Sequence, residues 1–214
     1  MSVDLIDELE AGELSIEFEG EEPQVVLEWA FQTFGSKIAL STSFQADSVA
    51  LIDMAYEIEP NVRVFSVDTG RLPAETHELA ERLRDRYPLM NLEIISPNAE
   101  EVAAMVTKHG PNLFQKQVDL RLLCCNVRKV EPLNRLLEGA AVWFTGVRRV
   151  DGPTRANAPI VSFDHARNLL KVNPLAAFTD DDMSTYETIH ELPRNPLTDR
   201  GYPSIGCWPC TRPV

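Results

Sequence analysis

The stretch from residue 37 to residue 58, KIALSTSFQADSVALIDMAYEI, decides the fold that we predict for this chain. An apolar run typical of a strand leads through small hydroxyl residues into a segment with helical spacing. Such a junction presents backbone N–H groups at a helix start, where unpaired donors and the helix dipole favour an anion. Ser41, Thr42 and Ser43 add hydroxyl donors there. An N-cap formed by Ser43 or Asp47 explains the same residues equally well, so both interpretations stay open.

The alternation of strand and helix continues on both sides of this stretch. A helix is predicted from Pro23 to Gly35, and strands followed by helices are predicted in NVRVFSVDTG and NLEIIS. AAVWFTG, APIVSFD and NLLKVNPL indicate three further strands, and FTDDDMSTYETIHELP indicates another helix. We therefore expect one α/β domain over residues 23–214, with a mostly parallel, twisted sheet covered by helices on both faces.

A second polar loop follows the strand in NVRVFSVDTG, where the chain turns at Asp68, Thr69 and Gly70. Ligands of open α/β sheets lie beyond the carboxyl ends of the strands, so this loop and residues 41–43 are candidate walls of one pocket. The carboxylate of Asp68 can accept hydrogen bonds from ribose hydroxyls. It can equally cap the helix that follows.

The only four cysteines form two pairs, Cys124 with Cys125 and Cys207 with Cys210, with 81 residues between the pairs. Disulfides are one explanation, but the chain opens without a signal segment, and cytosolic thiols stay reduced. A structural zinc site is a second explanation, although such sites usually draw on two CxxC hairpins. An iron–sulfur cluster is the third, because its separated irons accept thiolates from adjacent residues.

Two groups of cations accompany these features. Arg128 and Lys129 follow the first cysteine pair in a segment predicted to be helical from about Val118, with Pro132 as a kink or boundary. They can stabilise an anionic cluster or substrate, or they can be ordinary surface charge. The loop RRVDGPTR carries the second group, the guanidinium groups of residues 148, 149 and 155, which suit phosphate and sulfate oxygens but are also explained by solvation.

The charge of the chain is unevenly distributed. Residues 1–36 hold ten acidic side chains and no Lys or Arg, out of 33 acidic and 20 basic residues overall. We treat residues 1–22 as an acidic amino-terminal segment, which is typically solvated and partly disordered. No basic stripe suggests nucleic-acid binding, and no apolar run approaches membrane-spanning length, so we expect a cytoplasmic protein with neither partner. The four histidines show no ligand spacing and are interpreted as structural or exposed.

Several motifs together resemble the [4Fe-4S] adenylyl-sulfate (APS) reductases of assimilatory sulfate reduction. They are CCxxRK, GCxPCTR, STSFQADSV, FSVDTGRLPAETHELAERL, WFTGVRRVDGPTR, KVNPLAAFT and RNPLTDRGYPSIGC, and they cover roughly residues 29–214. The resemblance implies an adenine-nucleotide alpha-hydrolase-like (ATP-pyrophosphatase-like) fold, in which residues 41–43 form a phosphate-cradling loop. The SGGxDS glycines of that wider group are absent here, and VDGPTR replaces the common QSPTR.

The resemblance also assigns roles. It implies a [4Fe-4S] cluster on all four cysteines, with Lys129 between cluster and substrate. It implies a substrate site that includes the arginine loop. With the other candidate residues, this site comprises Ser41, Thr42, Ser43, Asp68, Gly70, Lys129, Arg148, Arg149 and Arg155. The expected reaction reduces adenylyl sulfate to sulfite and AMP with thioredoxin as donor, in cysteine biosynthesis. A reductase of the 3′-phosphorylated nucleotide (PAPS) and a noncatalytic nucleotide-binding iron–sulfur protein are the alternatives, and the sequence leaves open whether the protein is a homo-oligomer.

One feature of the family is missing from these 214 residues. Family members carry a further tail with an ECG(I/L)H motif, whose cysteine attacks the sulfur of adenylyl sulfate, releases AMP and is freed of sulfite by thioredoxin. The present sequence reads only to Val214, so no catalytic nucleophile is assigned in it. We expect that the tail has been lost from this form of the chain; a natural variant that binds nucleotide without turnover is the alternative.

Overall fold

The computed structural model describes residues 6–214, and its six strands form one sheet in the order β3-β2-β1-β4-β6-β5. The strands are β1 (Ile38–Ser41), β2 (Arg63–Val67), β3 (Asn91–Ile95), β4 (Val142–Phe144), β5 (Val161–Asp164) and β6 (Leu169–Val172). Every neighbouring pair is parallel except β5 with β6. The predicted mostly parallel α/β sheet is therefore confirmed.

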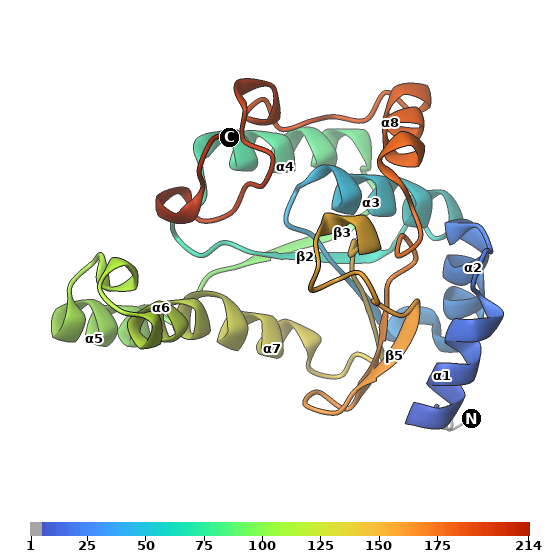
Figure 1. The fold of residues 1–214 in the computed structure, drawn as a ribbon, viewed down its shortest axis with the longest axis horizontal. Coiled ribbons are helices and arrows are strands. Elements are labelled where there is room, and N and C mark those ends of the chain that lie inside the picture. The colour runs from blue at the N-terminus through green and yellow to red at the C-terminus, as the bar shows by residue number, and fades with distance from the viewer. Residues whose placement is uncertain (1–5) are drawn as a thin grey trace.

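Helices cover both faces of this sheet (Figure 1). They are α1 (Glu8–Glu17), α2 (Pro23–Phe34), α3 (Ala46–Ile58), α4 (Ala74–Arg86), α5 (Ala99–His109), α6 (Val118–Cys125), α7 (Glu131–Leu137) and α8 (Asp180–Ile189). The helix predicted from Pro23 begins and ends as expected, with Gly35 at its C-cap. None of the helices within residues 6–214 has the length and apolar character needed to cross a membrane.

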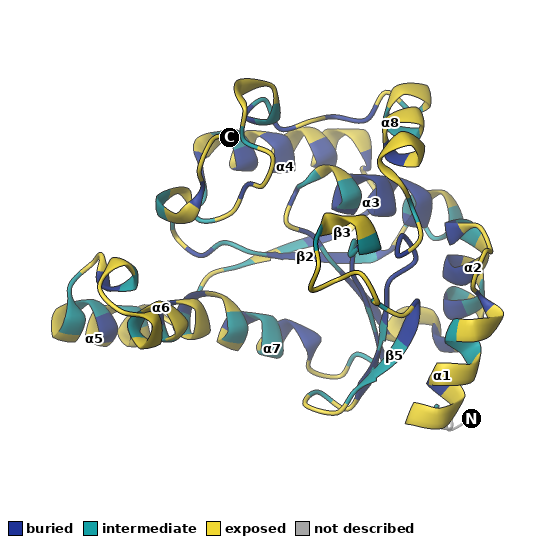
Figure 2. Ribbon diagram, viewed as in Figure 1, coloured by how far each residue is buried: buried dark blue, intermediate teal, exposed yellow. Residues whose placement is uncertain are grey.

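Strand alternation divides the sheet between two apolar layers, which Figure 2 shows as buried stretches on strands and facing helices. Leu40 and Phe144 belong to the larger core, which includes buried residues of α2, α3 and α4. Ala39 and Phe65 point to the other face and pack with Leu136 of α7. Both faces of the central strands are thus buried, as expected for a parallel sheet.

The strand order contains a switch point beside β1. The chain runs from β1 outward through β2 to β3, and then returns to the other side of β1 to form β4. Ligands of open α/β sheets bind at such a point, outside the carboxyl ends of the strands. The fold alone therefore directs attention to the loops after β1 and β4.

The acidic amino-terminal segment differs from the prediction. Residues 8–17 form α1, which packs along β5 and buries Ala11 completely. The Ser15 hydroxyl accepts a hydrogen bond from the Ile160 amide at 3.0 Å, which fixes the helix against the sheet edge. The partly disordered segment expected over residues 1–22 is corrected for the residues that the structure describes, because a few small and apolar side chains anchor an otherwise charged helix.

Pro132 does not interrupt the helix that carries the first cysteine pair. Residues 118–137 run as α6, a π-helical turn (η3, Asn126–Val130) and α7, with Pro132 in the first turn of α7. Proline lacks a backbone donor, and a first turn does not require that donor. The backbone hydrogen-bonding pattern changes at the π-helical turn. In place of the predicted kink or boundary at Pro132, the structure therefore has a change of helix type just before this residue.

Candidate functional site

A cavity of about 550 Å³ lies at the switch point, outside the carboxyl ends of β1, β2 and β4. Two segments close it from the sides. We call residues 118–137 the helical wall, which contributes Lys129 and Leu133, and residues 204–211 the loop wall, which contributes Ser204 to Cys207. The loops after β1 and β4 complete the lining.

The hydroxyl residues after β1 have different roles. Ser41 donates to the Phe144 carbonyl and accepts from the indole of Trp143, and Thr42 donates to Ser48. These two hydroxyls therefore hold the loop in shape. Ser43 is exposed and only accepts a hydrogen bond within the described residues, from a Gln45 amide at 3.2 Å, so its proton is available to a ligand. All of these residues line the cavity except Phe144.

The start of α3 faces the cavity without a side-chain cap. Its N-cap is Gln45, which makes no capping hydrogen bond, so the predicted cap by Ser43 or Asp47 is wrong. The loop after β4 packs tightly here, because a Cβ on Gly146 would lie 3.1 Å from backbone atoms of Asp47 and Ser48. Uncapped amides at a helix start suit an anion, as predicted from the strand–loop–helix pattern.

Asp47 is the acidic residue in the first turn of α3, and it lines the cavity. Burial raises the pKa of Asp47 to about 6, and the Arg148 charge opposes the rise. Arg148 Nε lies 2.8 Å from Asp47 Oδ1, but the buried Nε–H has no partner in hydrogen-bonding geometry. The ion pair therefore offsets only part of the cost of burying the carboxylate.

The loop after β2 corrects the sequence prediction. Asp68 accepts from the Gly70 amide at 2.8 Å and lies 3.1 Å from His77, and neither Asp68 nor Gly70 lines the cavity. Asp68 does not cap α4 either, since Pro73 occupies the N-cap. Thr69, between them, lines the cavity and lies 3.1 Å from the Cys207 sulfur. The turn therefore places Thr69 at the cavity and leaves Asp68 and Gly70 outside its lining.

The π-helical turn contains two adjacent cations, Arg128 and Lys129, with different surroundings. Arg128 is buried and donates to the Thr69 carbonyl at 2.7 Å, which ties the helical wall to the loop after β2. Lys129 is exposed and lines the cavity. One cation thus supports the site, and the other faces it.

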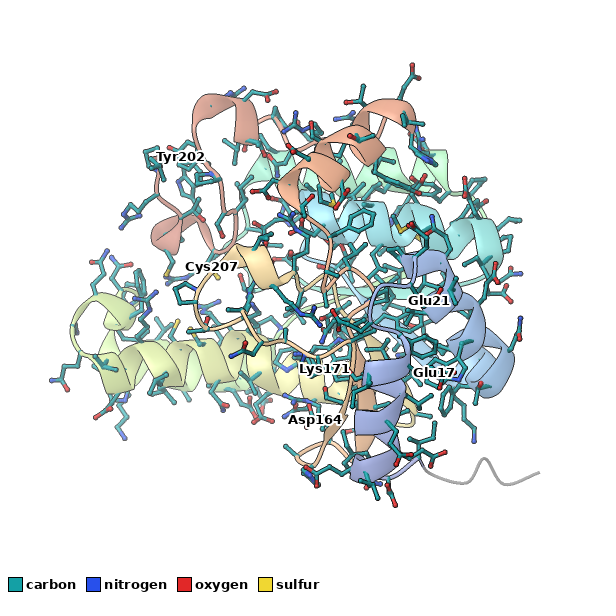
Figure 3. The ribbon with its side chains drawn as sticks, turned by 45° about the vertical axis from the view of Figure 1, so that its right-hand side comes forward. Glu17, Glu21, Asp164, Lys171, Tyr202 and Cys207 are labelled. Carbon is teal, nitrogen blue, oxygen red and sulfur yellow. The ribbon has the colours of Figure 1, made fainter. Side chains whose placement is uncertain are left out.

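The two cysteine pairs meet beside the cavity. Figure 3 shows Cys207 on the C-terminal loop, on the side that faces the helix of the other pair. Burial raises the pKa of the Cys124 thiol, and the Arg128 and Arg71 charges lower it. The neighbouring Cys125 and Cys207 thiols raise it, so Cys207 lies near Cys124 in the fold. All four thiols are free. Folding therefore gathers sulfur atoms that are far apart in sequence.

The spread of these sulfur atoms bears on the kind of centre they fit. Four thiolates around one tetrahedral ion lie about 3.8 Å apart, given the usual zinc–sulfur bond. Within residues 6–214, no cysteine belongs to a group of three or more potential metal ligands whose ligand atoms all lie within 4.8 Å of one another. A cluster with separated irons accepts a wider set. Four thiols from two segments, with Arg71 and Arg128 near Cys124, are a donor set that an iron–sulfur cluster can use.

The three arginines of the loop after β4 do not converge on one anion. Arg148 is buried and ion-paired with Asp47, Asp151 and Asp180, and Arg149 pairs with Glu19 of the amino-terminal segment. Carboxylates thus pair with these two arginines, and their predicted contact with a substrate anion stays a prediction. Arg155 pairs with Asp151 at 2.8 Å and lines the cavity.

Sequence reasoning missed part of the cavity. Trp143 and Lys171 line it from the middle of β4 and β6, where they are paired in register, and the Lys171 ammonium lies 5.3 Å from the centre of the indole ring. Gln45 accepts from the Ile205 amide at 3.0 Å and so fastens the loop wall. The one available signal was a lysine within the otherwise apolar strand LLKV.

A second cluster of titratable residues lies between α3 and α8. The Asp53 carboxylate is buried and accepts from Tyr87 at 2.6 Å and from Tyr186 at 2.9 Å. His190 Nδ1 lies 3.0 Å from the same carboxylate, and Glu57 is adjacent. Burial, with these hydrogen bonds, raises the pKa of both tyrosines. Both oxygens of Asp53 are committed, so we interpret the cluster as a structural link.

Comparisons with known proteins agree with this geometry. Residues 37–213 match the family described as phosphoadenosine phosphosulfate reductase domain. The chain is 39% identical over 88% of its length to the adenosine 5′-phosphosulfate reductase of Staphylococcus haemolyticus, of which it covers 76%. It is 41% identical over 90% of its length to the corresponding reductase of Pseudomonas aeruginosa strain LESB58, of which it covers 73%.

Solved structures give the same fold. The phosphate complex of phosphoadenylyl-sulfate (PAPS) reductase from Candida auris superposes with a TM-score of 0.82 at 27% identity, covering 96% of this chain and 98% of that one. The NH3-dependent NAD synthetase of Campylobacter jejuni shares the fold alone, with a TM-score of 0.57 at 13% identity over 90% of this chain and 78% of that one. The expected adenine-nucleotide alpha-hydrolase-like fold is confirmed. The chain belongs to the phosphoadenosine phosphosulfate reductase family.

Proposed function

We propose that this protein is an adenylyl-sulfate reductase, which reduces adenylyl sulfate to sulfite and AMP with a thioredoxin-type dithiol as donor in sulfate assimilation. The observation that carries the proposal is the position of the cavity. It lies at the switch point of an adenine-nucleotide fold, is lined by Lys129, Arg155 and Lys171, and includes Cys207 of the four-thiol group in its lining. The relatives that are 39% and 41% identical are adenosine 5′-phosphosulfate reductases.

The residues of the cavity are assigned binding and orienting roles. The Ser43 hydroxyl and the uncapped amides of α3 offer donors to phosphate oxygens. Lys129 of the helical wall and Arg155 of the loop after β4 both line the cavity and attract the doubly anionic phosphosulfate. Ser41, Thr42 and Arg148 shape the loops, and Asp68, Gly70 and Arg149 are proposed to act through the surrounding structure rather than by contact with substrate.

A [4Fe-4S] cluster is proposed on Cys124, Cys125, Cys207 and Cys210. When bound, it supplies an electron-rich centre whose charge acts on the neighbouring cavity. Thr69 supports Cys207 through its hydroxyl, and Arg128 supplies positive charge beside Cys124. Since each of the four thiols is assigned as a ligand, none is assigned as the nucleophile that attacks sulfur.

Nucleotide binding tests substrate choice directly. Anaerobically purified protein is titrated by calorimetry with adenylyl sulfate, its 3′-phosphorylated counterpart and AMP. We expect the tightest binding for adenylyl sulfate and at least about tenfold weaker binding by Lys129→Met, because one hydrogen bond to a charged group is lost. Equal or tighter binding of the 3′-phosphorylated nucleotide would favour the PAPS alternative, whose structural relative covers nearly the whole chain.

Metal analysis tests the cluster separately. We expect about four irons per chain and broad visible absorbance from sulfur-to-iron charge transfer, both lost in Cys124→Ser. Stoichiometric zinc in place of iron would refute this assignment. The genomic reading frame provides a further check: continuation into an ECG(I/L)H segment would supply the nucleophile, whereas its absence would favour a noncatalytic nucleotide-binding iron–sulfur protein.

A further inference from the structure

The Lys171 ammonium group lies on the cavity without a partner of opposite charge. Lys171 comes from the middle of β6 and is half-buried, and Figure 3 shows it on the sheet side of the site, away from the loop that bears Cys207. Among residues 6–214 no carboxylate lies within 4.0 Å of its Nζ atom, and no hydrogen bond to Nζ is formed. Partly buried lysines commonly keep the charged end where water or a ligand can reach it.

The surroundings of Lys171 explain why its charge is held there. The Trp143 ring carries two cations, since Lys171 Nζ and the Arg167 guanidinium each lie 5.3 Å from its centre. Arg167 is neutralised by Asp164 at 2.7 Å. Burial lowers the pKa of Lys171, and the Arg155 and Arg167 charges lower it further, while Asp164 opposes them. The indole face thus holds the ammonium group itself by a cation–π contact on the cavity lining, and no carboxylate of the described residues forms an ion pair with it.

Arg155 approaches the same space from the loop after β4. It lines the cavity and acts electrostatically on Lys171. Its partner Asp151 is shared with Arg148, so one carboxylate serves two guanidinium groups. Within residues 6–214, Asp151 is the only carboxylate that forms an ion pair with either Arg155 or Lys171, so an anion in the cavity could be bound by both cations.

We propose that Lys171 and Arg155 jointly bind one tetrahedral oxyanion of the nucleotide, either its phosphoryl or its sulfuryl group. The inference rests on the proposed function for the identity of the nucleotide. Arg155 presents a planar donor fork from the loop, and Lys171 adds a point charge from the sheet. The pair makes the sheet side of the cavity a second cationic contact, separate from Lys129 on the helical wall.

A purely structural role for Lys171 is the competing explanation, because its ammonium group also contacts the Trp143 ring. Lys171→Met retains an unbranched apolar stem and removes the charge, and Lys171→Arg retains the charge. Lys108→Met is the matched control, since Lys108 is exposed on α5 and outside the cavity. Thermal unfolding of each variant reports on packing independently of ligand binding.

The experiment is a calorimetric titration of the iron-loaded protein with adenosine, AMP and adenylyl sulfate. For Lys171→Met we expect adenylyl sulfate to bind about 10- to 100-fold more weakly, adenosine to bind as in the parent protein, and Lys171→Arg to recover most of the loss. Weakening of AMP as well would assign the phosphoryl group, and weakening of adenylyl sulfate alone would assign the sulfuryl group.

Two results would overturn the inference while the proposed function stands. One is unchanged affinity for adenylyl sulfate in Lys171→Met, and the other is an equal loss for adenosine, which would indicate a distorted pocket rather than a lost anion contact. Failure of the parent protein to bind any adenine nucleotide would overturn both proposals. Lys108→Met should match the parent protein in every titration.

Discussion

The two side walls of the cavity are built in opposite ways. The helical wall is a continuous run of α6, the π-helical turn and α7, and its far end is anchored in the core by Leu136 and Leu137, each 4% exposed. The loop wall contains one short 3-10 turn, Trp208–Cys210. Figure 1 shows it crossing above the long helix near the C-terminus. Several buried apolar side chains hold the helical wall, whereas Ile205 is the one apolar side chain of the loop wall that is as deeply buried.

Individual hydrogen bonds hold the loop wall instead. The Ile205 amide donates to Gln45, the Trp208 amide donates to the Arg71 carbonyl at 2.7 Å, and the Thr69 hydroxyl meets Cys207. Local stability follows the number of buried apolar contacts, so the loop wall should open more easily than the helical wall. The wall that carries Cys207 and Cys210 is thus the adjustable half of the site.

Leu136→Ala should produce the largest effect and test the anchored wall. The side chain is buried between α7 and the sheet, so its truncation should lower the free energy of unfolding by about 2–5 kcal/mol. Urea denaturation measures this loss. Leu122→Ala is the control, because Leu122 lies on the same wall but is 63% exposed, and its effect should stay within about 0.5 kcal/mol. Similar losses for the two variants would refute the assigned anchoring.

Asp47→Asn tests the start of α3, onto which the loop wall is fastened. The folded-state pKa of Asp47 is about 6, above the ordinary 3.8, so the folded state holds this proton more tightly than the unfolded state. The stabilising contribution of the protonated carboxyl is therefore present at low pH and declines as the pH rises through this interval. As the pH rises from below 3.8 to above 6, the free energy of unfolding of the parent protein should fall by up to about 3 kcal/mol relative to that of Asp47→Asn.

Urea denaturation of both proteins at several pH values provides the measurement for Asp47. The asparagine variant removes this one titration and leaves the other carboxylates unchanged, so the difference between the two curves isolates it. A parent protein that instead gains stability relative to Asp47→Asn with rising pH would show that the Arg148 ion pair, rather than burial, dominates the pKa of Asp47.

Gln45→Ala should affect the loop wall alone. It removes the acceptor of the Ile205 amide, which is worth about 1 kcal/mol, or roughly a fivefold rise in local opening. Hydrogen exchange at Ile205 should accelerate, with a change in global unfolding below about 0.5 kcal/mol. Gln45→Glu retains the Oε1 acceptor and should keep exchange slow. Equal acceleration across α7 would mean that the two walls open together.

The sequence predicted the anchored parts of the molecule well. Strong apolar periodicity defined β1, β2 and α2, and the two loops after β1 and β2 were expected to border one pocket. The cysteine pairs were predicted to meet at one centre, which stays a prediction, although Cys207 lies near enough to Cys124 to raise the pKa of its thiol. These features depend on local patterns or on the general rule for parallel sheets, so they can be inferred without coordinates.

The errors arose where tertiary packing decides the direction of a side chain. Asp68 and Thr69 are neighbours, and only the geometry of their turn determines that Thr69 faces the cavity. Arg149 and Arg155 are equivalent in the sequence pattern. In the fold, however, Arg149 forms an ion pair with Glu19, which lies 130 residues away in the sequence. Contacts between residues so distant in sequence have no local signature. The same holds for Lys171, which reaches the cavity because β6 lies beside β4.

Arg149→Gln should have the smallest effect, because it touches neither wall. Its bidentate pair with Glu19 is half-exposed, so the loss of stability should be about 0.2–1 kcal/mol and should shrink in high salt. Affinity for adenylyl sulfate should be unchanged, whereas Arg155→Gln should weaken it about tenfold. Calorimetry of the two glutamine variants side by side decides the matter. Comparable losses of affinity would return Arg149 to the substrate site and would mean that α1 moves away from the loop after β4 when nucleotide binds.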